Sequence, residues 1–241
     1  FVEREYLGTR EILKFPDHYV ALAVMVDNDV PAVNGRKIVP KGTIVGGKSG
    51  AVLDNLNKAV EGKYKVATYA SRTTGGESGA DNVIVFTALE AGTGGNAINI
   101  QIKKPSSTVT EIAVDVDNKD ITITGAGSTT AITSTAAEIA AAVNAHAQAK
   151  LLVFADASMN PEDADDPVVE ESKSTLTGGL ASSASGVEGV LLNDVDVTYG
   201  KKEGAMVIHG FIAVDKLPYG DDNADAVEKA ASSLPMIQFI K

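Results

Sequence analysis

The sequence predicts an α+β fold that is mostly β, in which a small β-rich host domain is interrupted by an inserted α+β domain with one clear helix. The 241 residues include 23 glycines and many short runs of valine, isoleucine and threonine between turn residues, which favour strands. One capping box predicts one amphipathic helix. The charge is also uneven, because residues 72–180 hold 15 acidic and 6 basic residues out of 32 and 21 in the chain.

The first part of the chain predicts an arm followed by short strands. Residues 1–20 mix charged and apolar side chains without a clear period, which is typical of an extended arm or an edge strand. Residues 21–26 (ALAVMV) predict a strand, and Asn34-Gly35 predicts a two-residue hairpin turn, since both residues tolerate positive φ. Further elements are expected as strands at 36–39, 43–45 and 66–69, and as one or two helical turns at 52–60.

The middle part has the complete set of elements of a separate domain. It begins where the composition shifts to glycine at residues 74–79. Thr135 and Glu138 form a capping box that predicts a helix over residues 136–148, with Ile139 and Val143 on its apolar stripe. Strands are predicted at 82–88, 97–103, 112–116, 121–124 and 151–155.

Residues 186–218 carry the most distinctive pattern of the chain. Aliphatic and β-branched residues predict strands at 190–197 and 205–214, on either side of the charged turn at 199–204. The segments GVLLNDVDVT and VIHGFIAVDKLP resemble the C-terminal core of phage head decoration proteins of the lambda D type. The segments FTALEAGTGGNAINI, TSTAAEIAAAVNAHA and STLTGG resemble a module that recurs as an insertion in phage capsid and tail proteins. Together the resemblances predict a decoration-type host domain, residues 1–71 and 181–241, and an inserted, surface-exposed domain, residues 72–180.

The resemblance to decoration proteins implies a structural virion protein and no enzyme. Such proteins bind as homotrimers to the major capsid protein on the outer surface of the expanded head, after synthesis in the host cytoplasm, and cement it. The resemblance also implies that the N-terminal arm, residues 1–20, contacts the capsid by adding to its strands. The expected contact residues are Phe1, Val2, Arg4, Tyr6 and Leu7. No cofactor or metal is expected.

Three alternatives remain open from the sequence. The chain could be a head fibre or adhesin-like surface protein, in which the insert makes a weak contact with glycans or the host surface. It could also be a tail-tube-associated virion protein, because the insert module occurs there. A nucleotide-dependent enzyme is the third alternative, because residues 42–49 (GTIVGGKS) match the phosphate-binding pattern G-x-x-x-x-G-K-S.

The local context argues against nucleotide binding at this motif. A phosphate-binding loop needs a buried strand before its first glycine and a helix that begins at its lysine. Here Pro40-Lys41 interrupts the chain before Gly42, and β-branched residues fill the positions of the wrapping loop. We therefore interpret the match as a coincidence of turns.

The remaining polar groups show no catalytic or metal-binding pattern. His209 is expected to be a packed, hydrogen-bonded core histidine that shares a strand face with Val207 and Phe211, and His146 is expected to be exposed on the helix. The acidic residues between 162 and 171 are interpreted as a solvated loop, with cation binding as the weaker alternative. Without cysteine there are no disulfides or thiolate metal sites.

Composition also limits the partners. The net charge of −11 disfavours nucleic acid, because phosphate binding requires a basic surface. No apolar run approaches the length that a transmembrane helix needs, so no membrane contact is expected.

Overall fold

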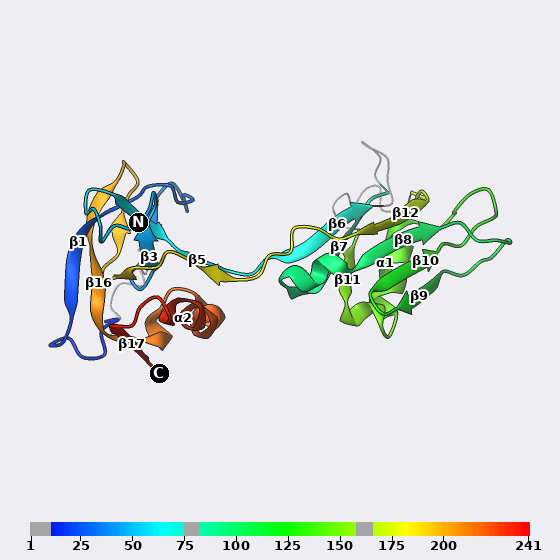
Figure 1. The fold of residues 1–241 in the computed structure, drawn as a ribbon. Coiled ribbons are helices and arrows are strands. Elements are labelled where there is room, and N and C mark those ends of the chain that lie inside the picture. Colours follow the sequence, from blue (N-terminus) through cyan, green and yellow to red (C-terminus); the bar gives the residue numbers. More distant parts are fainter. Residues whose placement is uncertain (1–10, 75–81, 158–165) are drawn as a thin grey trace. The chain divides into compact units, whose positions relative to one another are not determined.

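The computed structural model describes residues 11–74, 82–157 and 166–241, and the fold is mostly β, with two α-helices in these ranges (Figure 1). The chain divides into two compact units. Residues 1–66 and 182–241 form one, which we call the barrel unit, and residues 67–181 form the other, which we call the sandwich unit. The range 72–180, predicted from the sequence as an insert, lies within the sandwich unit.

A closed ring of short strands forms the centre of the barrel unit. The ring runs, in spatial order, through β1 (Val20–Val26), β4 (Ala59–Gly62), β3 (Ile44–Gly47), β14 (Gly189–Leu191) and β16 (Lys202–Ala213). It closes because β16 pairs antiparallel with β1 along the whole of β1, and the two strands lie side by side in Figure 1. Closure satisfies the backbone groups that a sheet edge would otherwise expose.

Strands far apart in the sequence meet in this ring. The strand β14, which lies in the segment 186–218, pairs with β16 on one side and with β3 on the other. Aliphatic side chains of the ring form two buried clusters: Ile44 and Val190 belong to one and Met206 to the other, and all three are fully buried. The predicted strand over 190–197 is split in the structure into β14 and the short β15 (Val195–Asp196), which pairs with β2 (Ile38–Val39).

The barrel unit contains a helix that the sequence analysis did not predict. This helix, α2 (Asn223–Ala231), buries Ala226 and Ala230 against Leu234 and Ile237. It is shorter and more polar overall than α1, and no side chain makes a capping hydrogen bond at its start, so it lacks the signal that marks α1. After the helix, β17 (Ile237–Ile240) adds parallel to the end of β16.

The prediction of helical turns at residues 52–60 is wrong. Residues 52–58 form turns, and β4 begins at Ala59. The strand forms because β1 and β3 supply backbone partners on its two sides and because Val60 is fully buried there. Tertiary pairing thus overrides the local preference.

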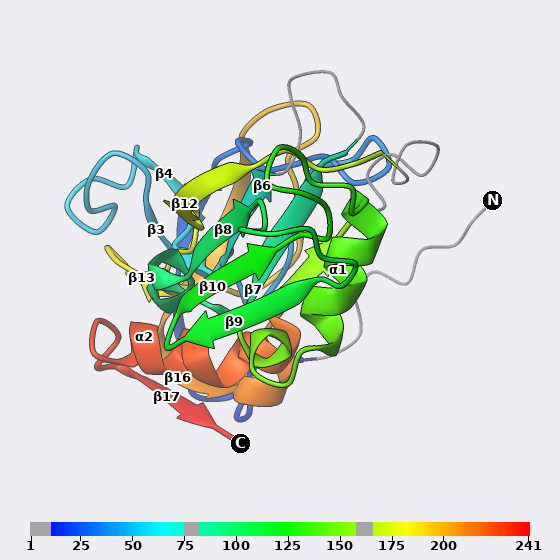
Figure 2. The ribbon, with the colours of Figure 1, turned by 90° about the vertical axis from the view of Figure 1, so that its right-hand side faces the viewer.

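Two sheets pack face to face in the sandwich unit. One sheet has the order β12-β8-β10-β9 and the other has the order β11-β7-β6, and Figure 2 shows β8, β10 and β9 in front with α1 at their side. The elements are β6 (Tyr69–Thr74), β7 (Ile84–Ala91), β8 (Asn99–Lys103), β9 (Ala113–Asp117), β10 (Asp120–Thr124), α1 (Ala136–Ala145), β11 (Val153–Asp156) and β12 (Glu171–Thr175). Phe86, Ile100 and Ile123 belong to the core between the sheets, and Ile139 brings α1 into the same core.

Two local predictions are confirmed in detail. Thr135 accepts the backbone N–H of Glu138, and the Glu138 carboxylate accepts the backbone N–H of Thr135, so the capping box opens α1. The helix ends at Ala145, three residues before the predicted limit. Asn34 and Gly35 both have positive φ, and Val33 and Arg36 exchange backbone hydrogen bonds across them.

The chain segments that link the two units are paired within each unit. In the barrel unit, β5 (Tyr64–Lys65) pairs antiparallel with β13 (Ser183–Ala184). In the sandwich unit, the Thr68 N–H donates to the Leu180 carbonyl, and the two residues form an antiparallel bridge. The outgoing and returning segments therefore run together in both units.

Candidate functional sites

The expected capsid contacts lie outside the described residues, but the root of the arm is described. Phe1, Val2, Arg4, Tyr6 and Leu7 all fall in residues 1–10. The next residues pair antiparallel with the end of β16. The Ala213 N–H donates to the Ile12 carbonyl at 2.9 Å, and the Lys14 N–H donates to the Phe211 carbonyl at 2.8 Å. Ile12 is fully buried, so residues 12–14 are fixed to the barrel unit.

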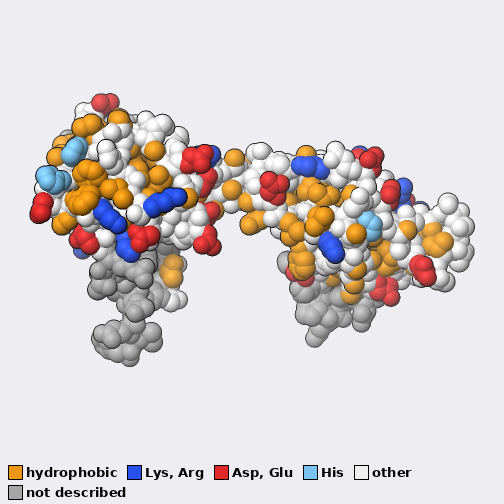
Figure 3. Space-filling view, turned by 90° about the horizontal axis from the view of Figure 1, so that it is seen from below, with side chains coloured by type: hydrophobic (Ala, Val, Ile, Leu, Met, Phe, Trp, Pro, Cys, Tyr) orange, Lys and Arg blue, Asp and Glu red, His pale blue; other side chains and the backbone are white. Residues whose placement is uncertain are grey.

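Apolar side chains surround this root. The Phe15 and Phe211 rings meet edge to face with centroids 5.2 Å apart, and Phe15 and Met236 remain 49% and 59% exposed. A shallow hollow lies beside them, lined by His209, Gly210, Phe211, Pro235, Met236 and Gln238. Figure 3 shows apolar side chains gathered on the barrel unit with histidines close by.

His209 differs from its prediction. It is half-buried on β16, but its Nδ1 atom is buried and has no hydrogen-bond partner among the described residues. The expected hydrogen bond is therefore not found at this atom. His146 lies at the C-terminal cap of α1, half-buried, and its Nδ1 accepts the Ala149 N–H at 3.2 Å.

The GTIVGGKS segment forms a buried strand. Residues Ile44–Gly47 are β3, so the positions that would wrap a phosphate are extended and paired with β4 and β14. Lys48 forms a turn, and its backbone N–H donates to the Ala59 carbonyl. The strand-loop-helix geometry of a phosphate-binding loop is therefore not formed at this motif.

The turn after β3 already holds an anion, which is the protein's own carboxylate. Glu188 Oε2 accepts the N–H groups of Gly47 and Val52 at 2.6 and 2.9 Å, and its Oε1 accepts the N–H of Leu53 at 2.8 Å. Burial raises the pKa of Glu188, but these backbone donors outweigh it and hold the pKa below the usual value. The three donors are thus committed within the fold.

The lysine of the motif is also committed to an internal partner. Its ammonium group contacts the carboxylate of Asp27, which is only 3% exposed, and lies 3.2 Å from Asp29. The ammonium group of Lys201, the residue just before β16, lies 3.3 Å from the Asp27 carboxylate. Burial raises the pKa of Asp27, but the hydrogen bonds from the two lysines lower it below its usual value. Lys48 therefore neutralises a buried carboxylate.

The predicted solvated acidic loop is described only in part. Glu162, Asp163 and Asp165 lie outside the described residues. Glu170 pairs with Lys104 at 3.1 Å, and Glu171 pairs with Arg72 at 3.0 Å. In the described ranges, no three His, Asp or Glu side chains lie close enough together to hold a metal ion. Neither α1 nor α2, the helices of the described part, has the length and apolarity needed to cross a membrane.

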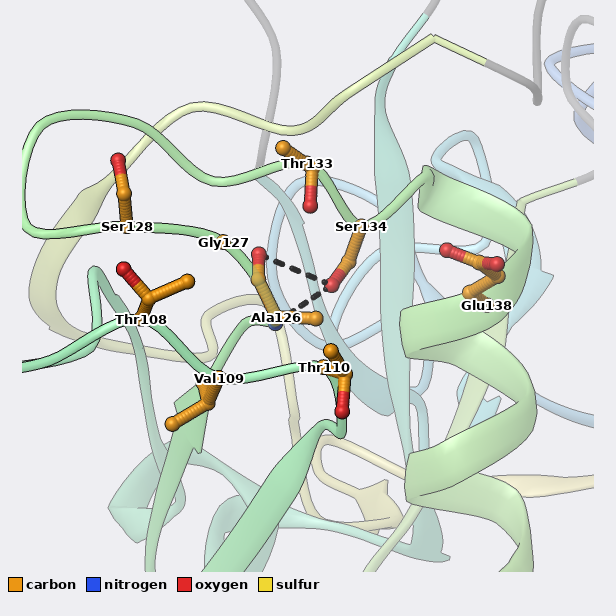
Figure 4. A pocket seen from close by; sticks show the side chains of 9 residues that line it. All are labelled: Thr108, Val109, Thr110, Ala126, Gly127, Ser128, Thr133, Ser134 and Glu138. Carbon is orange, nitrogen blue, oxygen red and sulfur yellow. Dashed lines mark hydrogen bonds between the residues drawn. The ribbon is translucent and has the colours of Figure 1, made fainter.

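The sandwich unit carries a hydroxyl-lined concavity that the sequence analysis missed. It has a volume of about 470 Å³ and lies beside the N-terminal part of α1 (Figure 4). Its lining consists of Thr108, Val109, Thr110, Ala126, Gly127, Ser128, Thr133, Ser134 and Glu138. The available signal was the density of serine and threonine in PSSTVT and GSTTAITST, which becomes a surface only when the two segments pair.

No known family model matches the chain, and neither the curated proteins nor the solved structures contain a match to it.

Proposed function

We propose that the chain is a capsid decoration protein, a structural virion protein that binds the outside of a phage head and stabilises it. In this proposal the barrel unit is a decoration-type host domain, and the sandwich unit is a domain inserted into it and exposed on the virion surface. The major capsid protein is the partner, and the chain acts as a homotrimer on the capsid.

The observation that carries the proposal is the root of the N-terminal arm. Backbone pairing of Ile12 and Lys14 with β16 fixes the residues that follow the predicted contact segment in the chain. A segment with a fixed root loses less conformational freedom when it adds to a strand of a partner, which lowers the entropic cost of binding. Three such arms on one trimer would combine weak contacts through their effective concentration.

Two further features support the division into host and insert. The segment that resembles decoration proteins supplies β14 and β16, which belong to the ring of the barrel unit. The linking segments are paired in each unit, so the ends of the sandwich unit lie next to each other, as an insertion into a host domain requires.

The proposal is tested by co-sedimentation of the full chain with expanded empty heads of the phage that encodes it. Binding is expected, together with a higher temperature of head disruption. The variant Tyr6→Ala/Leu7→Ala removes two predicted arm contacts and is expected to lower the affinity about tenfold, which corresponds to about 1.4 kcal/mol.

A matched variant controls for general loss of apolar surface. Leu151→Ala/Phe154→Ala also removes one leucine and one aromatic ring, from residues that are 72% and 52% exposed on the sandwich unit. This variant is expected to bind heads like the unchanged chain. Failure of the unchanged chain to bind expanded heads would overturn the proposed function, and equal losses in the two variants would overturn the role of the arm.

A further inference from the structure

The concavity of the sandwich unit is built by three chain segments that lie side by side. Gly127 forms antiparallel bridges with Val109 on one side and with Ile132 on the other. The Val109 N–H donates to the Gly127 carbonyl at 3.0 Å, and the Gly127 N–H donates back at 2.9 Å. In Figure 4 residues 108–110, 126–128 and 133–134 lie along these segments, and Glu138 faces them from α1.

Backbone geometry fixes the floor of this concavity. Gly127 has a φ of +145°, and a Cβ atom there would lie 2.3 Å from the Ala131 carbonyl oxygen, so only glycine allows the segments to approach this closely. Ser134 is buried, and its hydroxyl accepts the Ala126 N–H at 2.7 Å. The floor is thus held by the fold before any ligand arrives, which reduces the ordering cost of binding.

Several polar groups of the lining are available to a ligand. Thr108, Thr110 and Thr133 are exposed, and their hydroxyls make no hydrogen bond to any other described residue. The Oε2 atom of Glu138 accepts the Thr135 N–H at 3.0 Å. Its Oε1 atom accepts no hydrogen bond from any described residue. A threonine hydroxyl both donates and accepts, whereas a carboxylate oxygen accepts only.

The chemistry of the lining selects among classes of ligand. It contains no lysine, arginine or histidine, and its one charged group is the Glu138 carboxylate, so phosphates and other anions are disfavoured. A single carboxylate does not make a cation site, and Val109 is the largest apolar side chain present. The volume of about 470 Å³ lies within the range of roughly 300–1,000 Å³ that is usual for small-molecule sites.

We propose that this concavity is a binding site for a neutral carbohydrate, a hexose or hexosamine unit carrying free hydroxyl groups. Ligand hydroxyls would donate to Glu138 Oε1 and exchange hydrogen bonds with Thr110 and Thr133. The C–H face of the ring would contact Val109 and the threonine methyl groups. The inference is independent of capsid binding, because it uses only residues of the sandwich unit.

The test is a titration of the ¹⁵N-labelled full chain, followed by amide chemical shifts, with glucose, galactose, mannose and N-acetylglucosamine. Inorganic phosphate and N-acetylneuraminic acid serve as the anionic comparison. We expect at least one neutral sugar to give saturable shifts confined to residues 108–110, 126–128 and 133–138, with a dissociation constant on the order of 1 mM. A glycan array probed with the tagged full chain then distinguishes a free sugar from a unit of a surface polysaccharide.

Variants separate the site from non-specific contact. Thr110→Val/Thr133→Val preserves side-chain shape, removes two hydroxyls, and is expected to weaken binding at least about tenfold. Thr73→Val, an exposed threonine on β6, is the matched control and is expected to bind like the unchanged chain. Unchanged shifts of the core amides of β8 and β10 verify that each variant is folded.

Three results would overturn the proposal. They are the absence of saturable shifts with every neutral sugar, tighter binding of either anion, and undiminished sugar binding by the folded double variant. None of these results bears on the arm, so failure of this site leaves the capsid proposal standing.

Discussion

Replacing Glu188 by alanine tests how the barrel unit is held together at the turn after β3. The substitution removes the acceptor of three backbone N–H groups, those of Gly47, Val52 and Leu53. Gly47 and Val52 are buried, so their N–H groups lose their partner and regain water only in part, whereas Leu53 is 51% exposed. An unsatisfied buried donor costs about 1–3 kcal/mol. With partial access of water to the half-buried site, we expect a loss of about 3 kcal/mol in unfolding free energy.

Glu188→Gln refines the same prediction. Its amide oxygen can still accept from Gly47 and Val52, while its NH₂ group faces the exposed N–H of Leu53. The expected loss is therefore smaller, about 1 kcal/mol. Glu203→Ala on β16 is the control, since this glutamate is exposed and its side chain has no hydrogen bond or ion pair with another described residue.

Hydrogen exchange is the suitable assay, because a chain with two compact units need not unfold in one step. The amides of Val45 and Val60 report opening of β3 and β4, and they should exchange roughly a hundredfold faster in Glu188→Ala.

The pKa of Glu188 is lowered by folding, so its carboxylate stabilises the fold above the ordinary value of 4.5 and loses this effect as the pH falls through the folded pKa. The difference between Glu188→Ala and the unchanged chain should accordingly shrink in acid. A loss in Glu188→Ala no larger than in Glu203→Ala, or one that is the same at pH 3 and pH 7, would refute the reasoning.

Three further substitutions test other contacts. Tyr219→Phe removes the hydroxyl that accepts the N–H of fully buried Ile44 at 2.7 Å, and should cost about 2 kcal/mol by chemical denaturation. Because burial raises the pKa of Tyr219 to about 12, its contribution is complete below pH 10 and is lost between pH 10 and 12. The loss should be smaller in the variant, which keeps only the part that comes from Tyr64, whose pKa is also raised by burial. Gly46→Ala places a Cβ atom 1.8 Å from a backbone oxygen and should cost about 3 kcal/mol or more in thermal unfolding of the barrel unit. Asn144→Ala removes two hydrogen bonds to the backbone of Ala155, at 2.8 and 2.9 Å, and should cost about 2 kcal/mol, measured by hydrogen exchange in α1 and β11.

Each of these predictions has its own contradicting outcome. Gly35→Ala, where added atoms meet open space, is the control for Gly46→Ala and should cost only about 1 kcal/mol, so equal losses would contradict the steric argument. For Tyr219→Phe the contradicting result is an unchanged decline in stability between pH 10 and 12. For Asn144→Ala it is unaltered exchange of the α1 amides.

Local chemistry allowed part of the fold to be predicted. The capping box of Thr135 and Glu138 and the Asn34-Gly35 turn depend on hydrogen bonds and φ angles within a few residues, so the sequence carries the full information. The strands β8 and β10 were visible as alternating isoleucines because one face of each is buried. By contrast, α2 was missed because it is short, polar overall and without the side-chain cap that marks α1. The strand β4 was mistaken for helical turns because its pairing partners lie elsewhere in the chain.

The candidate sites show the same contrast between features set by neighbouring residues and features set by residues far apart in the chain. The expected contacts Phe1 to Leu7 came from a resemblance and stay a prediction, while the root at Ile12 became visible only through its pairing with β16. The sequence also indicated that GTIVGGKS is not a phosphate-binding loop, because β-branched residues occupy the loop positions. It could not indicate that Glu188 and Asp27 already occupy the donors of this region, since these carboxylates arrive from distant segments.

By itself the sequence determined the mostly β character of the chain, the position of α1 and the tight turns, because these depend on side-chain period and on contacts between near neighbours. Only the tertiary structure decided the closure of β16 onto β1, the internal carboxylate at the turn after β3 and the hydroxyl-lined concavity. The physical reason is that each of these joins backbone or polar groups from segments far apart in the chain, and such groups carry no local pattern until the hydrophobic cores bring them together.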